Sequence, residues 1–382
     1  MRNDIKFIAL GGGQAVGASC YFLKTENHSI LLDCGKGICE KSSYGPNLDA
    51  LYKIDGMESI SQIDSIFVSH GHYDHVGYIA EITESCRYTP VYATALTKLF
   101  AKHLIDEKTI EERAKLPIEM QIRQDSRILS ALEHITPIGY NSKISANNMQ
   151  FTFFKAGHIP GAAMIYIECD GRKILYTGDF SGVPTPLADK YIPPESISPD
   201  TVIICGVHAK HPKYKYSEDL SHRLKAVYEN LRYNLPVHIG VKQLTKGIEL
   251  IQFIRDMLPE GNIPIYLDAD TYAFAEKTEL ASGRRILDKY CGCYDFSNQY
   301  KPKGIYIGAE KYNRLFRHNH SIDYSLHSTY ADIEKLLSKY KPENAVIVHT
   351  SPDRENKYNN ILAESFPEIN IIYAENSELY EF

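Results

Sequence analysis

The chain has 382 residues, of which 43% are hydrophobic and 24% are charged, a balance typical of a globular protein. This length exceeds the size at which a single hydrophobic core stops growing, so two domains are expected. The formal net charge of -6 excludes a protein coated with basic surface for nucleic acid, while a local basic cleft stays compatible with it.

The cysteines and the apolar segments indicate a protein of a reducing compartment. The eight cysteines lie mostly inside apolar runs, which predicts reduced, buried thiols rather than a disulfide framework. The N-terminus lacks the apolar core of a secretory signal, and no stretch reaches the ~18 apolar residues of a membrane span. We therefore expect a cytoplasmic protein without a membrane partner. Cys291 and Cys293 form a lone Cys-x-Cys pair, for which a structural or incidental role is expected over a metal clip.

The N-terminal half of the chain alternates short β-branched runs with turn signals, which predicts a series of strands. Asp170-Gly171 is a hairpin signal between two of them. The expected strands are Ile5–Leu10, Ser29–Asp33, Ile63–Val68, Thr89–Tyr92, Phe151–Lys155, Met164–Glu168, Lys173–Tyr176 and Thr201–Cys205.

From about His208 the pattern changes to strands that alternate with helices, which predicts a small parallel α/β unit. Glu276–Lys303 shows no clear periodicity and receives no assignment. The expected elements of this unit are a helix at Ser217–Leu231, a strand at Val237–Val241, a helix at Thr245–Leu258 and a strand at Ile263–Leu267. After Ile322 the strand pattern returns, with a helix at Thr329–Tyr340 and a strand at Asn344–His349.

Four residues of metal-ligand type stand within six positions at the end of a predicted strand, in Ser69–Gly77 (SHGHYDHVG). His70 and His72 are two residues apart, so in extended chain their side chains point the same way. Asp74 and His75 fall where the chain is expected to turn into a helix. Imidazole and carboxylate groups bind zinc, manganese or iron. The spacing favours a metal site over the alternative of a polar loop rich in histidine.

Three further candidates, His158, Asp179 and His349, each stand directly beyond an apolar run. Taken singly, such a histidine is more often a loop or core residue than a ligand. Loops from one edge of a sheet converge, however, so together with the first cluster these residues supply two sets of ligands.

The order HxHxDH, a later histidine, a later aspartate and a terminal histidine resembles the metallo-β-lactamase superfamily. The resemblance is closer to its β-CASP nuclease branch, which includes the cleavage-and-polyadenylation and Integrator endonucleases and RNase J. The segments that carry it are Leu10–Cys20 (LGGGQAVGASC), Leu31–Gly35 (LLDCG), Ala156–Met164 (AGHIPGAAM), Tyr176–Asp179 (YTGD), Gly240–Leu250 (GVKQLTKGIEL), Ser325–Asp332 (SLHSTYAD) and Val346–His349 (VIVH).

This resemblance implies an α/β fold, a four-layer αβ/βα sandwich with two sheets back to back and helices outside. It also implies a small inserted α/β domain, the β-CASP domain, at residues 208–321. Residues 1–207 and 322–382 would form the two parts of the metallo-β-lactamase domain around that insert.

The resemblance further implies two divalent metal ions, with zinc expected and manganese as the alternative. Two such ions clamp the attacking and leaving oxygens of a phosphodiester displacement and supply hydroxide near neutral pH. Three residues are expected to hold each ion and one to bridge them: His70, His72 and His158; Asp74, His75 and His349; and Asp179.

His327 resembles the family histidine that protonates the leaving oxygen, a role suited to imidazole. His327, Asp74 and Asp179 are therefore the expected catalytic residues. In the nuclease branch an acidic residue orients this histidine from a position occupied here by Cys205. A thiol is a poor substitute for a carboxylate, so Asp323 and Asp332 are candidates for this role by their proximity in sequence.

Asp33 has two interpretations of about equal weight. It resembles a family aspartate that supports the metal ligands through hydrogen bonds. The alternative is an aspartate that caps the turn before Gly35.

The substrate expected from the resemblance is single-stranded RNA, with DNA as the alternative, because RNA-acting members carry a histidine at the position of His349. A protein partner that selects the substrate is compatible with the short insert, and the oligomeric state is left open. Basic residues and tyrosines in or near the insert are candidates for a phosphate-tracking, base-stacking cleft, with ordinary solvated surface as the alternative. They are Lys210, Lys213, Lys215, Lys242, Lys246, Lys301, Lys303, Lys311, Arg314, Arg317, Tyr214, Tyr216 and Tyr312.

Three hypotheses follow for the function. The leading one is a metal-dependent ribonuclease that cleaves as an endonuclease or as a 5′-exonuclease. The second is a small-molecule hydrolase, acting on an ester or thioester at the same site. The third is a non-catalytic scaffold that partners a nuclease, which the retention of all seven ligand candidates disfavours.

Overall fold

In the computed structural model, the described residues are 4–39, 42–215, 224, 225, 227, 229, 235–257, 263–322, 324–350 and 360–382. The chain divides into two compact units. Unit 1 comprises residues 1–184, 189–214 and 327–382, and unit 2 comprises residues 185–188 and 215–326. No helix in these described ranges is both long and apolar enough to cross a membrane.

Unit 1 contains two seven-stranded mixed sheets. The first has the order β21-β1-β2-β3-β6-β7-β8, and its strands β3, β6 and β7 run parallel. Its strands are β1 (Lys6–Gly11), β2 (Cys20–Lys24), β3 (Ser29–Leu32), β6 (Ser65–Phe67), β7 (Val91–Thr94), β8 (Ile135–Ile138) and β21 (Leu379–Glu381).

The second sheet has the order β20-β19-β13-β12-β11-β10-β9. An antiparallel meander, β10 to β12, continues into β13, β19 and β20, which all run parallel to β12. Its strands are β9 (Lys143–Ala146), β10 (Met149–Lys155), β11 (Ala163–Cys169), β12 (Arg172–Tyr176), β13 (Thr201–Cys205), β19 (Asn344–Val348) and β20 (Asn370–Tyr373).

The two sheets pack face to face through a shared apolar core. Phe7 and Phe67 from the first sheet meet Phe151, Phe153 and Ile165 from the second, and all five are buried. Fully burying a side chain of this size contributes about 1.5–3 kcal/mol each. Both faces of the first sheet are buried, because neighbouring residues of a strand, such as Phe7 and Ile8, enter this core and the core under the helices in turn.

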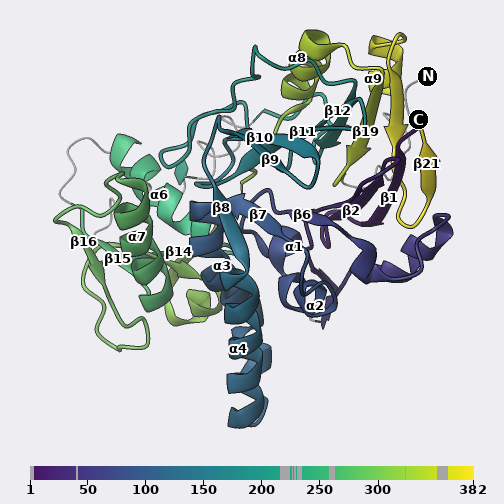
Figure 1. The fold of residues 1–382 in the computed structure, drawn as a ribbon. Coiled ribbons are helices and arrows are strands. Elements are labelled where there is room, and N and C mark those ends of the chain that lie inside the picture. The colour runs from purple at the N-terminus through teal and green to yellow at the C-terminus, as the bar shows by residue number, and fades with distance from the viewer. Residues whose placement is uncertain are drawn as a thin grey trace. The chain divides into compact units, whose positions relative to one another are not determined.

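Helices cover the outer faces of the sandwich (Figure 1). A second apolar core joins helices α1 to α4 to the outer face of the first sheet, and α8 and α9 lie outside the second sheet. The predicted four-layer αβ/βα sandwich is confirmed. The outer elements are α1 (Tyr73–Val76), α2 (Ile79–Ser85), α3 (Ala95–Arg113), α4 (Ile118–Glu133), α8 (Tyr330–Tyr340) and α9 (Ile361–Ser365), with 3-10 turns η1 (Leu48–Lys53) and η2 (Ile60–Gln62) and the ribbon β4 (Gly37–Cys39) and β5 (Ser42–Tyr44).

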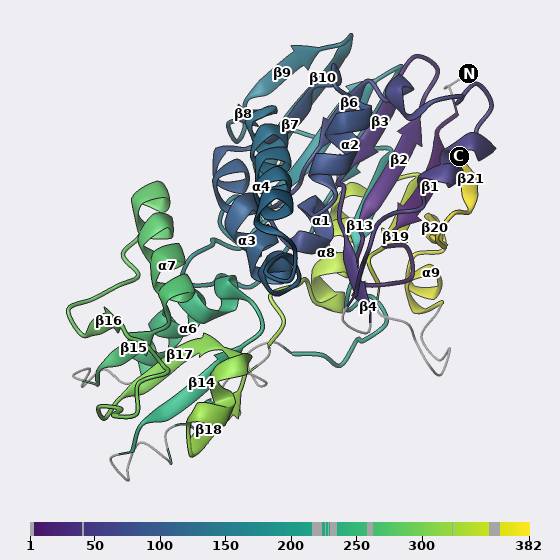
Figure 2. The same ribbon diagram turned by 90° about the horizontal axis from the view of Figure 1, so that it is seen from below.

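Unit 2 is a five-stranded sheet of order β16-β15-β17-β14-β18, in which every pair is parallel. Helices α6 and α7 run along one side of it (Figure 2). This confirms the predicted small parallel α/β unit. Its elements are β14 (Val237–Val241), α6 (Leu244–Met257), β15 (Ile265–Leu267), α7 (Ala269–Ser282), β16 (Cys291–Cys293), β17 (Ile305–Ala309), η3 (Glu310–Leu315) and β18 (His318–Ser321).

Some elements differ from the sequence prediction. The helix predicted at Ser217–Leu231 lies largely outside the described residues. The segment that received no assignment, Glu276–Lys303, contains the end of α7 and the short strand β16. The long helices α3 and α4 had no counterpart among the predicted elements.

We expect unit 2 to lose stability as the pH rises, because Glu249 on α6 is 1% exposed and burial raises its pKa to about 8. Thr185 and the backbone N–H of Leu187 donate hydrogen bonds to it. The folded pKa lies above the unfolded value near 4.5, so the stabilisation is complete below that value and is lost as the pH rises through about 8. Thermal unfolding at several pH values between 6 and 9 should show a falling midpoint in the wild type and a flatter curve in Glu249→Gln.

Asp256→Asn, at an exposed carboxylate of the same helix, is the matched control and should follow the wild type. Parallel curves for the wild type and Glu249→Gln would contradict the assignment of this pH dependence to Glu249.

Candidate metal centre

The strand directions bring the predicted ligands to one place. In the first sheet the C-terminal end of β6 leads into His70, and in the second sheet β10, β12 and β19 point the same way and lead to His158, Asp179 and His349. Atoms of these residues and their neighbours that could hold a metal ion lie within 4.8 Å of one another in three groups. The groups are His70, His72, His158 and Asp179; Asp74, His75 and His349; and Asp179, His327 and His349.

The carboxylate of Asp179 is the centre of this cluster. Its Oδ2 atom lies 3.0 to 3.9 Å from one ring nitrogen of each of five histidines. They are His70, His75, His158, His327 and His349. The Oδ2 atom of Asp179 therefore lies close to histidines of both predicted ligand sets.

The remaining contacts divide the histidines into two sets. The ring nitrogen Nδ1 of His72 lies 3.1 Å from Nε2 of both His70 and His158. On the other side, Nε2 of His349 lies 3.7 Å from Oδ2 of Asp74. All of these side chains are buried except Asp74, which is 28% exposed.

Three residues of the site adopt a left-handed backbone conformation that side chains other than glycine rarely take. The φ angles are +58° at Asp33, +58° at His158 and +51° at His349. Each residue stands just beyond the end of a strand, so the unusual turn aims its side chain at the cluster. Such conformations cost about 1–3 kcal/mol each and gather at functional sites.

Asp33 supports the cluster from behind. Its carboxylate accepts hydrogen bonds from the backbone N–H of Ser69 at 2.6 Å, from the Ser69 hydroxyl at 2.7 Å and from Tyr176 at 2.5 Å. The same carboxylate contacts Nδ1 of His75 at 2.7 Å, which leaves Nε2 of that ring facing Asp179. Of the two interpretations of Asp33, these bonds favour support of the ligands over capping of a turn.

Ser19 provides a second support that sequence reasoning missed. Its hydroxyl lies 2.8 Å from Nδ1 of His349 and 3.4 Å from Nε2 of His75. It thus connects the second ligand set to the glycine-rich loop after β1. The only signal in the sequence is its place within the segment Leu10–Cys20 that resembles the family.

Burial keeps His70 and His72 neutral. It lowers the pKa of His70 and of His72 well below the usual range, because a charged ring would be desolvated there. Burial also lowers the pKa of His349, against the opposing effect of the Asp179 carboxylate. Neutral imidazole is the form that binds a metal ion.

At the centre of the cluster, opposite charges shift the pKa values of His75 and Asp179 against the effect of burial. Burial alone would lower the pKa of His75, but Asp179 and Asp33 raise it well above the usual range. Burial alone would raise the pKa of Asp179, but His349, His75 and His327 hold it well below the usual range. Asp179 is therefore a charged carboxylate within a buried cluster of imidazoles.

The donor set fits divalent metal ions. Among the described residues, Oδ1 of Asp179 and Nε2 of His349 are buried atoms without a hydrogen-bond partner. Buried polar groups are rarely left in this state, and a metal ion would satisfy both. Five imidazoles and two carboxylates also match the nitrogen and oxygen ligands that zinc accepts.

His327 is oriented differently from the prediction. Its Nε2 atom lies 3.0 Å from Oδ2 of Asp179, and its side chain is 21% exposed. Asp332 was wrong as a candidate to orient it, because its carboxylate bonds the backbone N–H and hydroxyl of Thr329 and caps α8. Asp323 lies outside the described residues. Cys205 is buried, and its sulfur lies 3.5 Å from the hydroxyl of Tyr176.

Two of the lysines proposed for a phosphate-tracking cleft are not at the surface. Lys210 and Lys246 are buried, at 2% and 8% exposure, and this contradicts the idea that they line a surface cleft. The ammonium group of Lys210 bonds Gln14, and that of Lys246 lies over the ring of Tyr324. Tyr216 lies outside the described residues.

The cysteines agree with the prediction of reduced thiols. All eight, each within the described residues, are free, and five of them are buried. Within the described ranges, neither Cys291 nor Cys293 belongs to a group of three or more metal-ligating side chains.

Comparisons with known proteins agree with this geometry. The sequence model of the family described as anti-Pycsar protein Apyc1 matches residues 5–234, more than half of the chain. The chain belongs to the Apyc1 family of metallo-β-lactamase-fold proteins. A second model, described as a Zn-dependent metallo-hydrolase RNA specificity domain, matches residues 316–372. The predicted relationship to the β-CASP branch is thereby confirmed.

Curated relatives are similar over part of their length. Endoribonuclease ysh1 of Schizosaccharomyces pombe is 27% identical over 69% of this chain and 34% of its own. Two proteins of Methanocaldococcus jannaschii follow: an RNase J-like protein, 29% identical over 68% of this chain and 57% of its own, and a probable RNase, MJ4, 35% identical over 46% and 39%. The chain thus spans about a third to three fifths of the length of these relatives.

One solved structure is similar over its whole length. The crystal structure of a protein of unknown function from Enterococcus faecalis V583 aligns over 100% of both chains, with a TM-score of 0.63 at 13% identity. At this identity the likeness concerns the fold alone.

We expect Asp33→Asn to weaken metal binding by about 10–100-fold, the usual effect of losing a residue that orients a ligand. The amide would replace one of the oxygens to which Ser69, Tyr176 and His75 bond. Equilibrium dialysis against graded zinc, with metal analysis of the retained protein, measures the change.

Asp170→Asn is the matched control, because Asp170 is also a hydrogen-bonded carboxylate of unit 1 but bonds Thr25 and Asn27 instead. Equal zinc affinity in Asp33→Asn and the wild type would rule out the supporting role of Asp33.

Proposed function

We propose that the protein is a metal-dependent ribonuclease that hydrolyses phosphodiester bonds. The observation that carries this proposal is the buried cluster around Asp179, in which two ligand sets share one carboxylate. The ribonucleases among the similar proteins and the RNA specificity domain matched at residues 316–372 support RNA as the substrate.

Each ligand set would hold one divalent ion, zinc first and manganese as the alternative. His70, His72 and His158 form one set, and Asp74, His75 and His349 the other, with Asp179 between them. Bound divalent ions supply a water of lowered pKa and neutralise the charge that develops on the phosphate.

The residues of the chain have separate tasks around that chemistry. Asp33 orients His75 and Ser19 orients His349. Each of them contacts Nδ1 of its ring, while Nε2 of that ring is the nitrogen near Asp179. Burial of the cluster excludes bulk water and strengthens every charge interaction within it. Asp179 reduces the repulsion between two cations because its carboxylate stays charged.

His327 is the group best suited to pass a proton to the leaving oxygen. It is partly exposed, while the other histidines of the cluster are buried, so it can reach a bound polymer from the edge of the site. Its contact with Asp179 holds the ring in place. General acid catalysis of this kind contributes about 10²–10⁴-fold to a rate.

A second candidate, a hydrolase of a small molecule, is favoured by one observation. The Apyc1 family model covers residues 5–234, which contain most of the candidate ligands. The same site could act on an ester, a thioester or a small phosphodiester. This candidate predicts hydrolysis of a small substrate without cleavage of a polymer.

The decisive measurement is cleavage of end-labelled single-stranded RNA and sequence-matched DNA with zinc or manganese. We expect metal-dependent cleavage of RNA by the wild type, and its loss in Asp74→Ala/His75→Ala because one ligand set would be incomplete. The ladder of labelled products distinguishes endonuclease from 5′-exonuclease cleavage.

Bis(p-nitrophenyl) phosphate and a p-nitrophenyl ester, assayed in parallel, test the second candidate. Intact RNA together with hydrolysis of a small substrate would exclude the ribonuclease and favour the small-molecule hydrolase. No reaction with any substrate, with two metal ions bound, would favour the scaffold.

His327→Gln should separate catalysis from metal binding. We expect kcat to fall about 10²–10⁴-fold, because the proton donor is removed, while two metal ions stay bound. Metal analysis of the purified variant together with single-turnover cleavage measures both effects. A loss of one metal ion in this variant would identify His327 as a ligand instead.

A further inference from the structure

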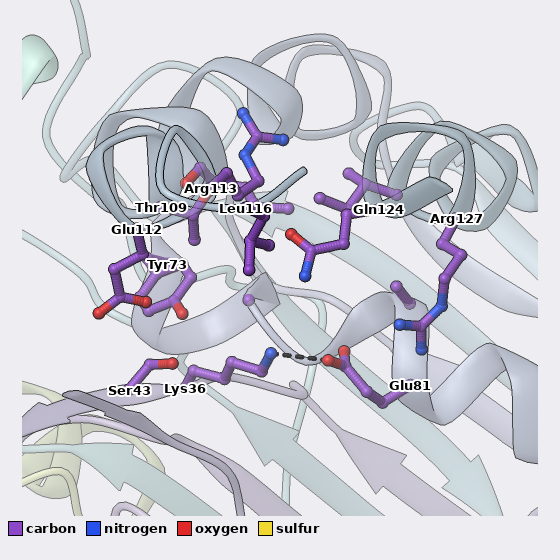
Figure 3. Close-up of a pocket in the computed structure, with 14 residues that line it drawn as sticks. Lys36, Ser43, Tyr73, Glu81, Thr109, Glu112, Arg113, Leu116, Gln124 and Arg127 are labelled. Carbon is purple, nitrogen blue, oxygen red and sulfur yellow. Dashed lines mark hydrogen bonds and ion pairs between the residues drawn. The ribbon is translucent and has the colours of Figure 1, made fainter. Parts of the chain in front are cut away.

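A cavity lies against the short helix α1, which carries two of the candidate metal ligands. Its volume is about 270 Å³, and its walls come from α1, α2, α3, α4 and the chain between Lys36 and Ser43 (Figure 3). All of these walls belong to unit 1. Pockets for drug-sized molecules measure about 300–1,000 Å³, so this cavity suits a smaller molecule. None of the roles assigned to the metal centre uses it.

One end of the cavity has hydrogen-bond donors in excess. Lys36 bonds Glu81 at 2.7 Å, and Arg127 bonds Glu84 through two of its nitrogens. An ammonium group has three N–H donors and a guanidinium group has five, so both side chains can donate further bonds. The side-chain amide of Gln124 points into the same space (Figure 3) and has no hydrogen bond to another described residue. A carboxylate would accept from all three groups.

The opposite end has a carboxylate without a cation. Glu112 stands there at the exposed rim beside Tyr73, on the other side of the cavity from Arg127 (Figure 3). Within the described part of the chain, Glu112 forms no ion pair. Burial raises the pKa of Tyr73, and the charge of Glu112 raises it further, so the two side chains are electrostatic neighbours. An ammonium group at this end would balance the charge of Glu112.

Aliphatic side chains line the space between the two ends. Ile105 of α3, Leu116 of the connection and Ile128 of α4 contribute to this lining. Leu116 stands between Glu112 and Gln124 in Figure 3. A chain of methylene groups placed here would be removed from water, which favours its binding.

Ion pairs between α3 and α4 hold one wall of the cavity in place. Asp125 of α4 accepts from Lys102 and Arg113 of α3, and Asp106 of α3 accepts from the same two side chains. Arg113 also lines the cavity, but its charge is already matched by these two aspartates. The wall is thus preformed, which lowers the entropic penalty of binding a ligand.

The distribution of charge favours a zwitterion over an ion of one sign. An anion alone would leave Glu112 without a cation and would add negative charge beside Glu81. A cation alone would leave the donors of Lys36, Arg127 and Gln124 unused. A zwitterion with separated charges satisfies both ends and adds no net charge to the cavity.

The cavity is connected to the metal centre through the backbone. Tyr73, whose side chain is 6% exposed, stands between two candidate ligands in the sequence. Its carbonyl accepts from the N–H of Lys36 at 3.1 Å, and the carbonyl of His75 accepts from the N–H of Cys34 at 2.9 Å. Two residues that line the cavity therefore belong to the backbone that positions the ligands on and before α1.

We propose that this cavity binds a small aliphatic ω-amino acid, whose carboxylate meets Lys36, Arg127 and Gln124 and whose ammonium group meets Glu112. The bound molecule holds Tyr73 and the backbone of α1 in place, and thereby strengthens metal binding. Linkage requires that the metal strengthens binding of the amino acid by the same factor. The proposal does not depend on the proposed ribonuclease activity.

Isothermal titration calorimetry on the full, zinc-loaded chain tests the ligand class with 5-aminopentanoate. We expect a dissociation constant of about 0.1–1 mM, which is reasonable for a molecule of this size. Pentylamine and pentanoate each carry one of the two charges, and 2-aminopentanoate is an isomer with adjacent charges. Each of these three should bind about tenfold more weakly or worse, because one end of the cavity stays unsatisfied.

Substitutions at the two ends test the location. Lys36→Met and Glu112→Gln should each weaken binding of 5-aminopentanoate about tenfold or more, because a hydrogen bond to a charged group is lost. Lys115→Met and Glu111→Gln, at exposed positions that do not line the cavity, are the matched controls and should bind as the wild type does. Circular dichroism checks the fold, and Glu112→Gln keeps the test valid if Lys36→Met does not fold, because Glu112 is exposed.

Equilibrium dialysis against graded zinc, with and without about 10 mM 5-aminopentanoate, tests the connection to the metal centre. We expect the amino acid to lower the zinc dissociation constant of the wild type about fivefold, and to leave that of Glu112→Gln nearly unchanged. The variant also corrects for zinc that the amino acid binds in solution, because this effect is common to both proteins.

Three results would overturn the proposed site: no binding of 5-aminopentanoate up to about 10 mM, equal binding of a compound with one charge or with adjacent charges, or unchanged binding in Glu112→Gln. A zinc affinity that stays the same while the cavity is occupied would overturn the connection to the metal centre.

Discussion

The charged carboxylate of Asp179 is the interaction on which the candidate site depends. A buried aspartate surrounded by five imidazoles is stable only if the rings orient their nitrogens toward it, and the contacts of 3.0 to 3.9 Å show that they do. Asp33 and Ser19 fix two of the rings from behind. One atom of Asp179 is left without a partner among the described residues, as expected where a cation belongs.

The topology of the two sheets brings these residues together. The strands that carry them end at one edge of the sandwich, and short loops then reach inward from both sheets. At Asp33, His158 and His349 the chain adopts a left-handed turn that is unfavourable for these residues. Such strain persists when the surrounding structure holds it in place, and here the two packed sheets provide that constraint.

Strands that depend on residues close together in the sequence were predictable, whereas contacts between residues from distant parts of the chain were not. The strands β13 and β14 have the predicted bounds, because a fully buried strand is a continuous apolar run. Ser19 lies 330 residues from His349, and no local pattern indicates that contact. The helix α4 was not predicted; only Ala131 and Leu132 near its C-terminal end are buried, while apolar residues such as Ile118 and Ile122 are exposed.

The division of the chain separates the candidate centre from the inserted unit. Every residue of the metal cluster lies in unit 1, and the insertion leaves unit 1 after Tyr214 and returns at His327. The first residue of the returning segment is therefore the one partly exposed histidine of the cluster, among the described residues. The candidate ligands thus all lie within unit 1, and His327 directly follows the segment of the chain that belongs to unit 2.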